Sequence, residues 1–80
     1  MLDELKTAKK FVGIKQSLKA INKGIVLEAY VAKDAEPGIT GKLITLCEAN
    51  NIEVFYCDTM NALGEACGIH IGAACAVTVK

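Results

Sequence analysis

The segment IVLEAYVAKDAEPGITGKLITLCEANNIEVFYC, residues 25–57, predicts a strand, a helix and a second strand in succession. Residues 25–31 are mostly apolar, as in a buried strand, and the polar turn 33–37 follows them. Pro37 suits a first helical turn, and apolar residues then recur at helical spacing as far as Asn50. The β-branched and aromatic residues 52–57 predict the second strand. The helix makes the connection long enough for two parallel strands.

The segment before it predicts another strand and helix. Residues 10–12 suit a short strand, and Gly13 interrupts the chain. Residues 14–23 then carry Ile14, Leu18 and Ile21 at the i, i+4, i+7 spacing of a helix, which Gly24 ends.

The two ends of the chain complete the predicted fold. Leu2 and Leu5, within a charged run, predict a short opening helix. Asp58 or Thr59 can cap a short helix that stops at Gly68, and residues 74–79 predict a last strand. Strands that alternate with helices imply a sheet covered on both faces, so the expected fold is a three-layer α/β/α sandwich with about four strands.

Length and composition predict a single domain over residues 1–80. A chain of 80 residues with 52% hydrophobic residues buries only about 60% of its unfolded surface, too little for two cores. The first ten residues are charged throughout, and no later stretch is long and apolar enough for a membrane span. We therefore expect a cytoplasmic monomer that does not enter a membrane.

Charge is distributed unevenly along the chain, although the net charge is zero. Residues 1–24 hold six lysines and two acids, a net charge of +4, whereas residues 25–80 hold three lysines and seven acids, a net charge of −4. A local basic surface can bind nucleic acid whatever the net charge. Lysines that merely solvate exposed helices would give the same count.

One side of the predicted helix at residues 14–23 is basic. It carries Lys15, Lys19 and Lys23 together with Gln16 and Asn22, opposite the apolar stripe. No acidic residue lies between residues 5 and 27, which is unusual for a helix that is only solvated. Lysines can hold phosphates, Gln16 can read a base edge, and Gly13 lets a ligand approach the first helical N–H groups. This face is a candidate phosphate-binding surface.

The predicted loop at residues 68–74 contains two large aliphatic residues, Ile69 and Ile71, between glycines. An apolar loop tip that glycines bring close to a ligand suits packing against an unstacked base. Alternatively, Ile69 and Ile71 begin the last strand and point into the core. His70 is expected to face solvent.

The four cysteines are expected to be buried free thiols, because the chain is apolar and shows no secretion signal. They lack the close spacing of zinc-binding pairs. A thiol-based redox or metal site at Cys67, His70 and Cys75 is the weakest alternative. No base or oxyanion donor can be assigned to a cysteine nucleophile, so we expect no enzyme activity, no metal and no cofactor.

Four segments resemble the kink-turn-binding ribosomal proteins of the L7Ae/L30e group, in the order and spacing of that family. They are GIKQSLKAINKG (residues 13–24), VAKDAEP (31–37), LCEANNI (46–52) and LGEACGIHIGAA (63–74). The chain is most similar to the short bacterial members. The resemblance implies a mixed sheet of parallel and antiparallel strands, and binding to an RNA bulge flanked by tandem sheared G·A pairs.

By match of position, the resemblance also implies which residues touch the RNA. One group would contact the G·A pairs and adjacent phosphates: Gly13, Lys15, Gln16 and Lys19. Lys23 and Lys33 would extend the phosphate contacts. A last group would cover the flipped-out nucleotide: Ile69, Ile71, Gly72 and Ala73. Archaeal members commonly have Asn and Glu at the positions of Lys15 and Gln16, so this chain would depend more on phosphate contacts.

The expected partner is therefore kink-turn RNA, within ribosomal, riboswitch or other noncoding RNA, with association with the ribosome as a further expectation. The competing hypothesis is a protein-interaction or small-ligand module that keeps the same fold without RNA.

Overall fold

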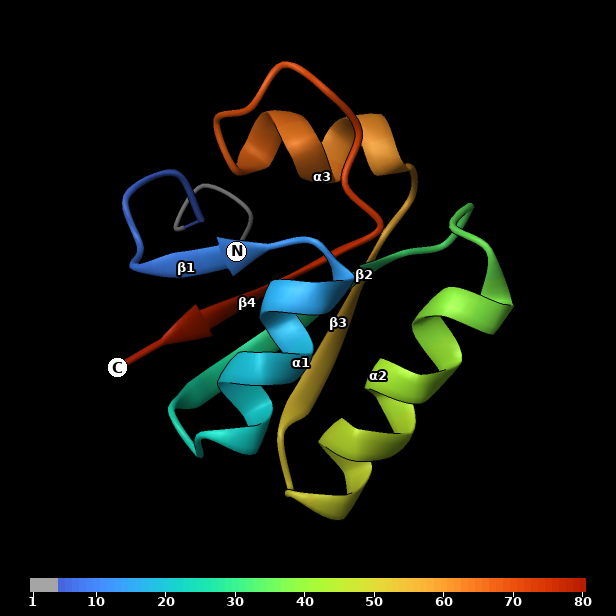
Figure 1. Ribbon diagram of the computed structural model, residues 1–80. Coiled ribbons are helices and arrows are strands. Elements are labelled where there is room, and N and C mark those ends of the chain that lie inside the picture. Colours follow the sequence, from blue (N-terminus) through green and yellow to red (C-terminus); the bar gives the residue numbers. More distant parts are fainter. Residues whose placement is uncertain (1–4) are drawn as a thin grey trace.

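The structure is a computed structural model that describes residues 5–80. Its elements follow the predicted order (Figure 1): β1 (Lys10–Val12), α1 (Ile14–Asn22), β2 (Val26–Ala32), α2 (Pro37–Ala49), β3 (Glu53–Cys57), α3 (Met60–Ala66) and β4 (Cys75–Val79). Their bounds differ from the predicted ones by at most two residues. The opening helix expected around Leu2 and Leu5 lies largely outside the described residues, and Leu5 and Lys6 belong to a 3-10 turn.

Local sequence signals explain where the helices begin and end. Pro37 occupies the first turn of α2. Thr59, one of the two predicted caps of α3, accepts a hydrogen bond of 3.0 Å from the Ala62 N–H at its side-chain oxygen. Gly24 and Gly68 follow the last turns of α1 and α3, as predicted, and both have a positive φ.

The four strands form one mixed sheet in the order β1-β4-β2-β3. β2 and β3 run parallel, whereas β4 runs antiparallel to both of its neighbours, β1 and β2. The mixed sheet that the family resemblance implies is confirmed.

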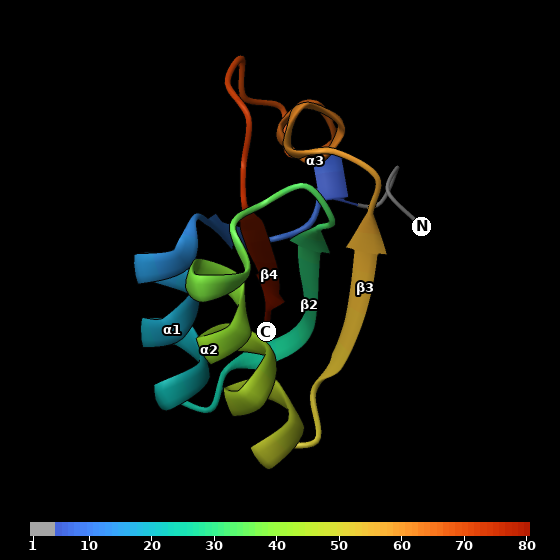
Figure 2. The ribbon, with the colours of Figure 1, turned by 90° about the vertical axis from the view of Figure 1, so that its right-hand side faces the viewer.

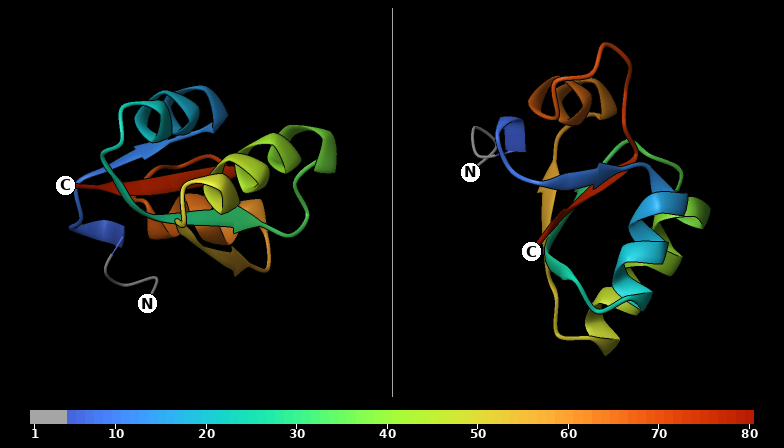
Figure 3. Two further views of the ribbon diagram at one scale, coloured as in Figure 1. Left: turned by 90° about the horizontal axis from the view of Figure 1, so that it is seen from below. Right: turned by 60° about the vertical axis from the view of Figure 1, so that its left-hand side comes forward.

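Helices cover both faces of this sheet, with α1 and α2 on one face and α3 on the other (Figure 3). Alternate strand residues supply the two cores: Val31 and Val77 pack with α1 and α2, whereas Tyr30 and Ala76 pack towards α3. Leu5, which is fully buried, joins the core on the α3 side. The predicted α/β/α arrangement is therefore confirmed.

The strand directions bring several chain connections to the same end of the strands. β1, β2 and β3 run the same way and end at Val12, Ala32 and Cys57, and β4, which runs opposite, begins there at Cys75. The start of α1, the turn after β2 and the loop before β4 therefore lie together at this end of the sheet (Figure 1).

Candidate nucleic-acid interface

A backbone hydrogen bond joins the two segments that the sequence singles out. The Gly13 N–H donates to the carbonyl oxygen of Cys75 at 2.9 Å. Gly13 immediately precedes α1, and Cys75 immediately follows the loop 68–74. Figure 2 shows this loop rising above the sheet next to α3 and descending to β4 near the beginning of α1. One ligand can therefore touch both segments.

The beginning of α1 is open to a ligand. Gly13 has φ 95° and ψ 159°, a conformation that residues with a side chain rarely adopt, and no side chain from the described part of the chain caps the helix. The first turn carries no acidic residue. Its N–H groups and the helix dipole therefore favour an anion such as phosphate.

The lysines of α1 form a stripe on its exposed surface. Lys15, Lys19 and Lys23 are all exposed and succeed one another every four residues, so the stripe is about 12 Å long. Gln16 is exposed beside Lys15 at the helix start, whereas Lys23 follows the last helical residue at the opposite end. The predicted division of the helix into a polar and an apolar side is confirmed.

The apolar loop exposes one of its two isoleucines. The Ile71 side chain is 75% exposed, whereas Ile69 is half-buried and packs against the core on the α3 side. Neither belongs to β4, so the alternative that both begin the last strand is wrong, and only Ile69 packs against the core. His70 and Gly72 are exposed, as predicted for His70. Ala73 is buried, and its N–H donates to the Met60 carbonyl at 3.0 Å.

Contacts that the sequence did not reveal hold this loop against α3. Gly64, inside α3, has no β-carbon, and the Ile71 carbonyl fills that space. A second long-range contact holds α3 itself: the Asp34 carboxylate, in the turn after β2, accepts a hydrogen bond of 2.8 Å from the Met60 N–H at the start of α3. A glycine within a predicted helix is a signal of such close packing, because glycine destabilises a helix unless a close contact compensates for it.

Lys33 lies at the margin of the surface. Its Nζ is 3.5 Å from Asp58 Oδ1, and both side chains are largely exposed. Lys33 follows β2 and Gly13 follows β1, and β4 lies between these two strands, so the backbones of the two residues are two strands apart. Its charge is therefore shared with an acidic group of the β3–α3 connection, unlike the charges along α1.

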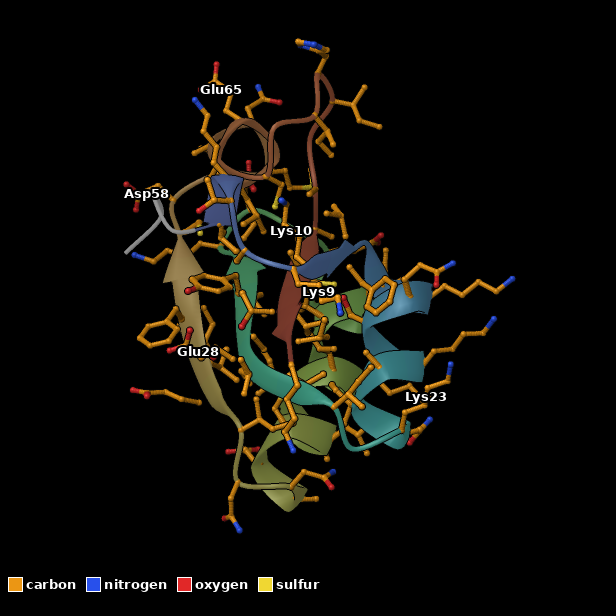
Figure 4. All side chains as sticks on the ribbon, turned by 90° about the vertical axis from the view of Figure 1, so that its left-hand side faces the viewer. Lys9, Lys10, Lys23, Glu28, Asp58 and Glu65 are labelled. Carbon is orange, nitrogen blue, oxygen red and sulfur yellow. The ribbon has the colours of Figure 1, made fainter. Side chains whose placement is uncertain are left out.

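Basic and acidic side chains, which are unevenly distributed along the sequence, also lie on different sides of the folded protein. Figure 4 shows Lys9 and Lys23 on the side of β1 and α1, and Glu28, Asp58 and Glu65 on the side of β3 and α3. A groove of about 340 Å³ between α3 and the loop includes Glu65 and Asn61 in its wall. Because a carboxylate there repels phosphate, a polyanion would reach the loop from the side of α1.

The thiols do not form a reactive site in the described part of the chain. Cys47, Cys57, Cys67 and Cys75 are free and buried, which confirms the expected burial. Burial raises the pKa of each thiol, and the neighbouring Cys75 raises the pKa of Cys47 further. Thiolates, the nucleophilic form, are therefore disfavoured.

Within residues 5–80, no group of three or more His, Cys, Asp or Glu side chains is placed to hold a metal ion. Nor does any helix in the described residues have the length and apolarity needed to cross a membrane.

A comparison with known protein families identifies the family of the chain. The model of the Ribosomal protein L7Ae/L30e/S12e/Gadd45 family matches residues 2–80. The chain belongs to this family.

Two relatives of the chain are named for RNA binding. RNA-binding protein TTE2299 of Caldanaerobacter subterraneus subsp. tengcongensis is 46% identical over 71 residues, which cover 89% of this chain and 87% of that protein. RNA-binding protein BH0128 of Halalkalibacterium halodurans is 46% identical over 63 residues, or 79% of this chain and 77% of that protein.

A solved structure supports the same fold. The structure of the Giardia lamblia 15.5kD RNA binding protein is similar with a TM-score of 0.89 and 28% identity, over 99% of this chain and 70% of that one. The family resemblance predicted from the sequence is thus confirmed, whereas the RNA contacts of individual residues stay predictions.

Proposed function

We propose that this protein binds RNA at kink-turns, through the beginning of α1 and the loop 68–74, and that it acts in the cytoplasm without catalysis. The observation that carries the proposal is the Gly13–Cys75 hydrogen bond, which puts a cationic helix start beside a loop with a 75% exposed isoleucine. The names of its relatives support RNA as the class of ligand.

The two halves of the surface suit the two unusual features of a kinked duplex. Lys15 and Lys19, with the free N–H groups of the first turn, would neutralise phosphates that the kink brings together, while Gln16 reaches a base edge. Ile71 would cover the extruded base, because an aliphatic side chain can pack on a base that has lost its stacking partner.

The protein would act by shifting the RNA towards its bent conformation. Binding can change that equilibrium only by as much as the protein prefers kinked over extended RNA. If Lys15, Lys19, Lys23 and Lys33 each neutralise one phosphate, log K should fall against log salt with a slope of roughly −3 to −4.

Calorimetric titration with two hairpins tests this proposal. One hairpin contains a three-nucleotide bulge flanked by tandem G·A pairs, and the control has the same stem with Watson–Crick pairs and no bulge. We expect saturable binding to the first and only weak, salt-sensitive binding to the second. Equal affinities would contradict kink-turn recognition, and no binding to either would favour a protein-interaction or small-ligand module.

Ribosomal RNA, riboswitches and other noncoding RNAs can all contain kink-turns, so the cellular target needs a separate measurement. Sequencing the RNA that is recovered with the tagged protein from cells would identify it and would show whether the ribosome is a partner.

A further inference from the structure

We propose that Phe11 stacks on a second unpaired base of the bound RNA, so that the RNA interface extends beyond α1 to the edge strand β1. This inference rests on the proposed function, because it adds a contact to the same surface. It assigns to Phe11 a role that the family resemblance did not supply.

The strand register places the Phe11 side chain on the same sheet face as α1. Phe11 is paired with Val77, which packs in the core beneath α1 and α2, whereas the next residue, Val12, packs towards α3. Strand residues alternate between the two faces, so Phe11 emerges beside α1. β1 is an edge strand, so no further strand among residues 5–80 covers it, and Phe11 remains 40% exposed.

The surroundings of Phe11 are cationic. It lies two residues before Gly13, at the entrance to the helix that carries Lys15 and Lys19. Figure 4 shows Lys9, beside β1, on the same side of the molecule as Lys23 at the end of α1. Exposed aromatic rings among lysines are the arrangement by which proteins hold unpaired bases, since the lysines track the phosphates while the ring stacks.

Tyr56 provides a matched contrast at the opposite edge of the sheet. It is 53% exposed in the edge strand β3, and its partner in the register, Val31, belongs to the same core as Val77. Its neighbours along the chain include Glu53 and Asp58, which repel phosphate. Tyr56 is therefore an exposed aromatic residue on the same sheet face as Phe11, but with acidic rather than basic neighbours.

The chain contains no tryptophan, so Phe11→Trp introduces a unique fluorophore at the proposed contact. The probe is the kink-turn hairpin described above, and Tyr56→Trp is the control. We expect the fluorescence of the Phe11→Trp protein to be quenched in proportion to the RNA bound, and that of the Tyr56→Trp protein to stay unchanged.

Affinity measurements separate stacking from simple apolar cover of the core. Phe11→Leu keeps an apolar side chain but removes the ring, and we expect it to bind about 5- to 150-fold more weakly, the range for loss of one base–ring stack. Phe11→Trp should keep the affinity of the unmodified protein. Thermal unfolding of each variant checks that β1 remains folded.

Three outcomes have distinct meanings. A quenched Phe11→Trp protein together with weakened binding by Phe11→Leu would support the inference. Normal binding by Phe11→Leu, or binding by Phe11→Trp without a fluorescence change, would overturn it and leave the proposed function intact. Failure of the unmodified protein to bind the hairpin would instead overturn the proposed function, and with it this contact.

Discussion

The carbonyl oxygen of Ile71 occupies the place that a β-carbon on Gly64 would take. The exposed tip of the loop is thereby fixed against α3 through backbone contact. Any residue with a side chain at position 64 must push the loop away from the helix.

We therefore predict that Gly64→Ala lowers both stability and RNA affinity. Overpacking of this kind costs about 1 to 3 kcal/mol of the free energy of unfolding, and the displaced loop loses its contact with the extruded base. Thermal unfolding and calorimetric titration with the kink-turn hairpin would measure the two effects.

Gly38→Ala is the control for that substitution. Gly38 also lies in a helix, but a β-carbon there meets no atom within 4 Å. We expect it to raise stability by up to about 1 kcal/mol and to leave RNA affinity unchanged. Identical behaviour of the two variants would contradict the role given to Gly64.

Lys19→Ala should weaken RNA binding by about 1 to 3 kcal/mol with little change in stability, because an exposed phosphate contact would be lost. Lys80→Ala removes the same charge at the end of β4 that faces away from the interface. Titration at two salt concentrations should show a shallower salt dependence for Lys19→Ala alone. A similar loss for both variants would mean that only net charge matters.

Ile71→Asp should weaken RNA binding while the fold is preserved, because its side chain is already 75% exposed. The new carboxylate repels phosphate and cannot pack on a base. Leu27→Asp is the matched control, since Leu27 is 53% exposed near the beginning of β2, away from the interface. Unchanged affinity in Ile71→Asp would exclude the loop from the binding surface.

Asp58→Asn should tighten RNA binding, at low salt, by up to about fivefold. It releases Lys33 from an exposed ion pair that contributes at most about 1 kcal/mol, and so makes this charge available to phosphate. Glu53→Gln changes the net charge equally at the start of β3, far from Lys33. If both variants tighten binding to the same extent, general electrostatics rather than Lys33 is responsible.

The buried thiols predict a loss of stability at alkaline pH. Burial raises their pKa in the folded protein, so the unfolded chain loses these protons at lower pH than the folded one. The contribution is fully present below the ordinary thiol pKa of about 8.5 and is lost as the pH rises through the folded values. Urea unfolding between pH 7 and 10 would measure it, and Cys75→Ala should reduce the slope.

The periodicity of the sequence was sufficient to predict the elements and the exposed side of α1. Ile14, Leu18 and Ile21 determine which side of α1 faces the core, and helical geometry then places the lysines on the exposed side. The order of the strands has no such local signal. The alternation of side chains along a strand could not predict the exposure of Ile69 and Ile71 either. In a strand both side chains would lie on the same face, whereas in this loop Ile69 is half-buried and Ile71 is exposed.

Contacts between distant residues account for the rest. Asp34 and Met60 are hydrogen-bonded although 26 residues separate them, and nothing at either position predicts the partner. Phe11 reads as one residue of a short strand until the register shows that it emerges beside α1. These features depend on how the elements pack, and single-sequence patterns carry little of that information.

The position of β4 between β1 and β2 has a consequence for folding during synthesis. β1 joins the sheet only through β4, and Lys10 is paired with Thr78, so most of the chain must be translated before β1 finds its neighbour. A nascent chain that stops short of residue 75 also lacks the acceptor for the Gly13 N–H. Such a chain would carry the lysines of α1 without the loop anchored beside them, so the proposed binding of bent RNA would require β4 to be in place.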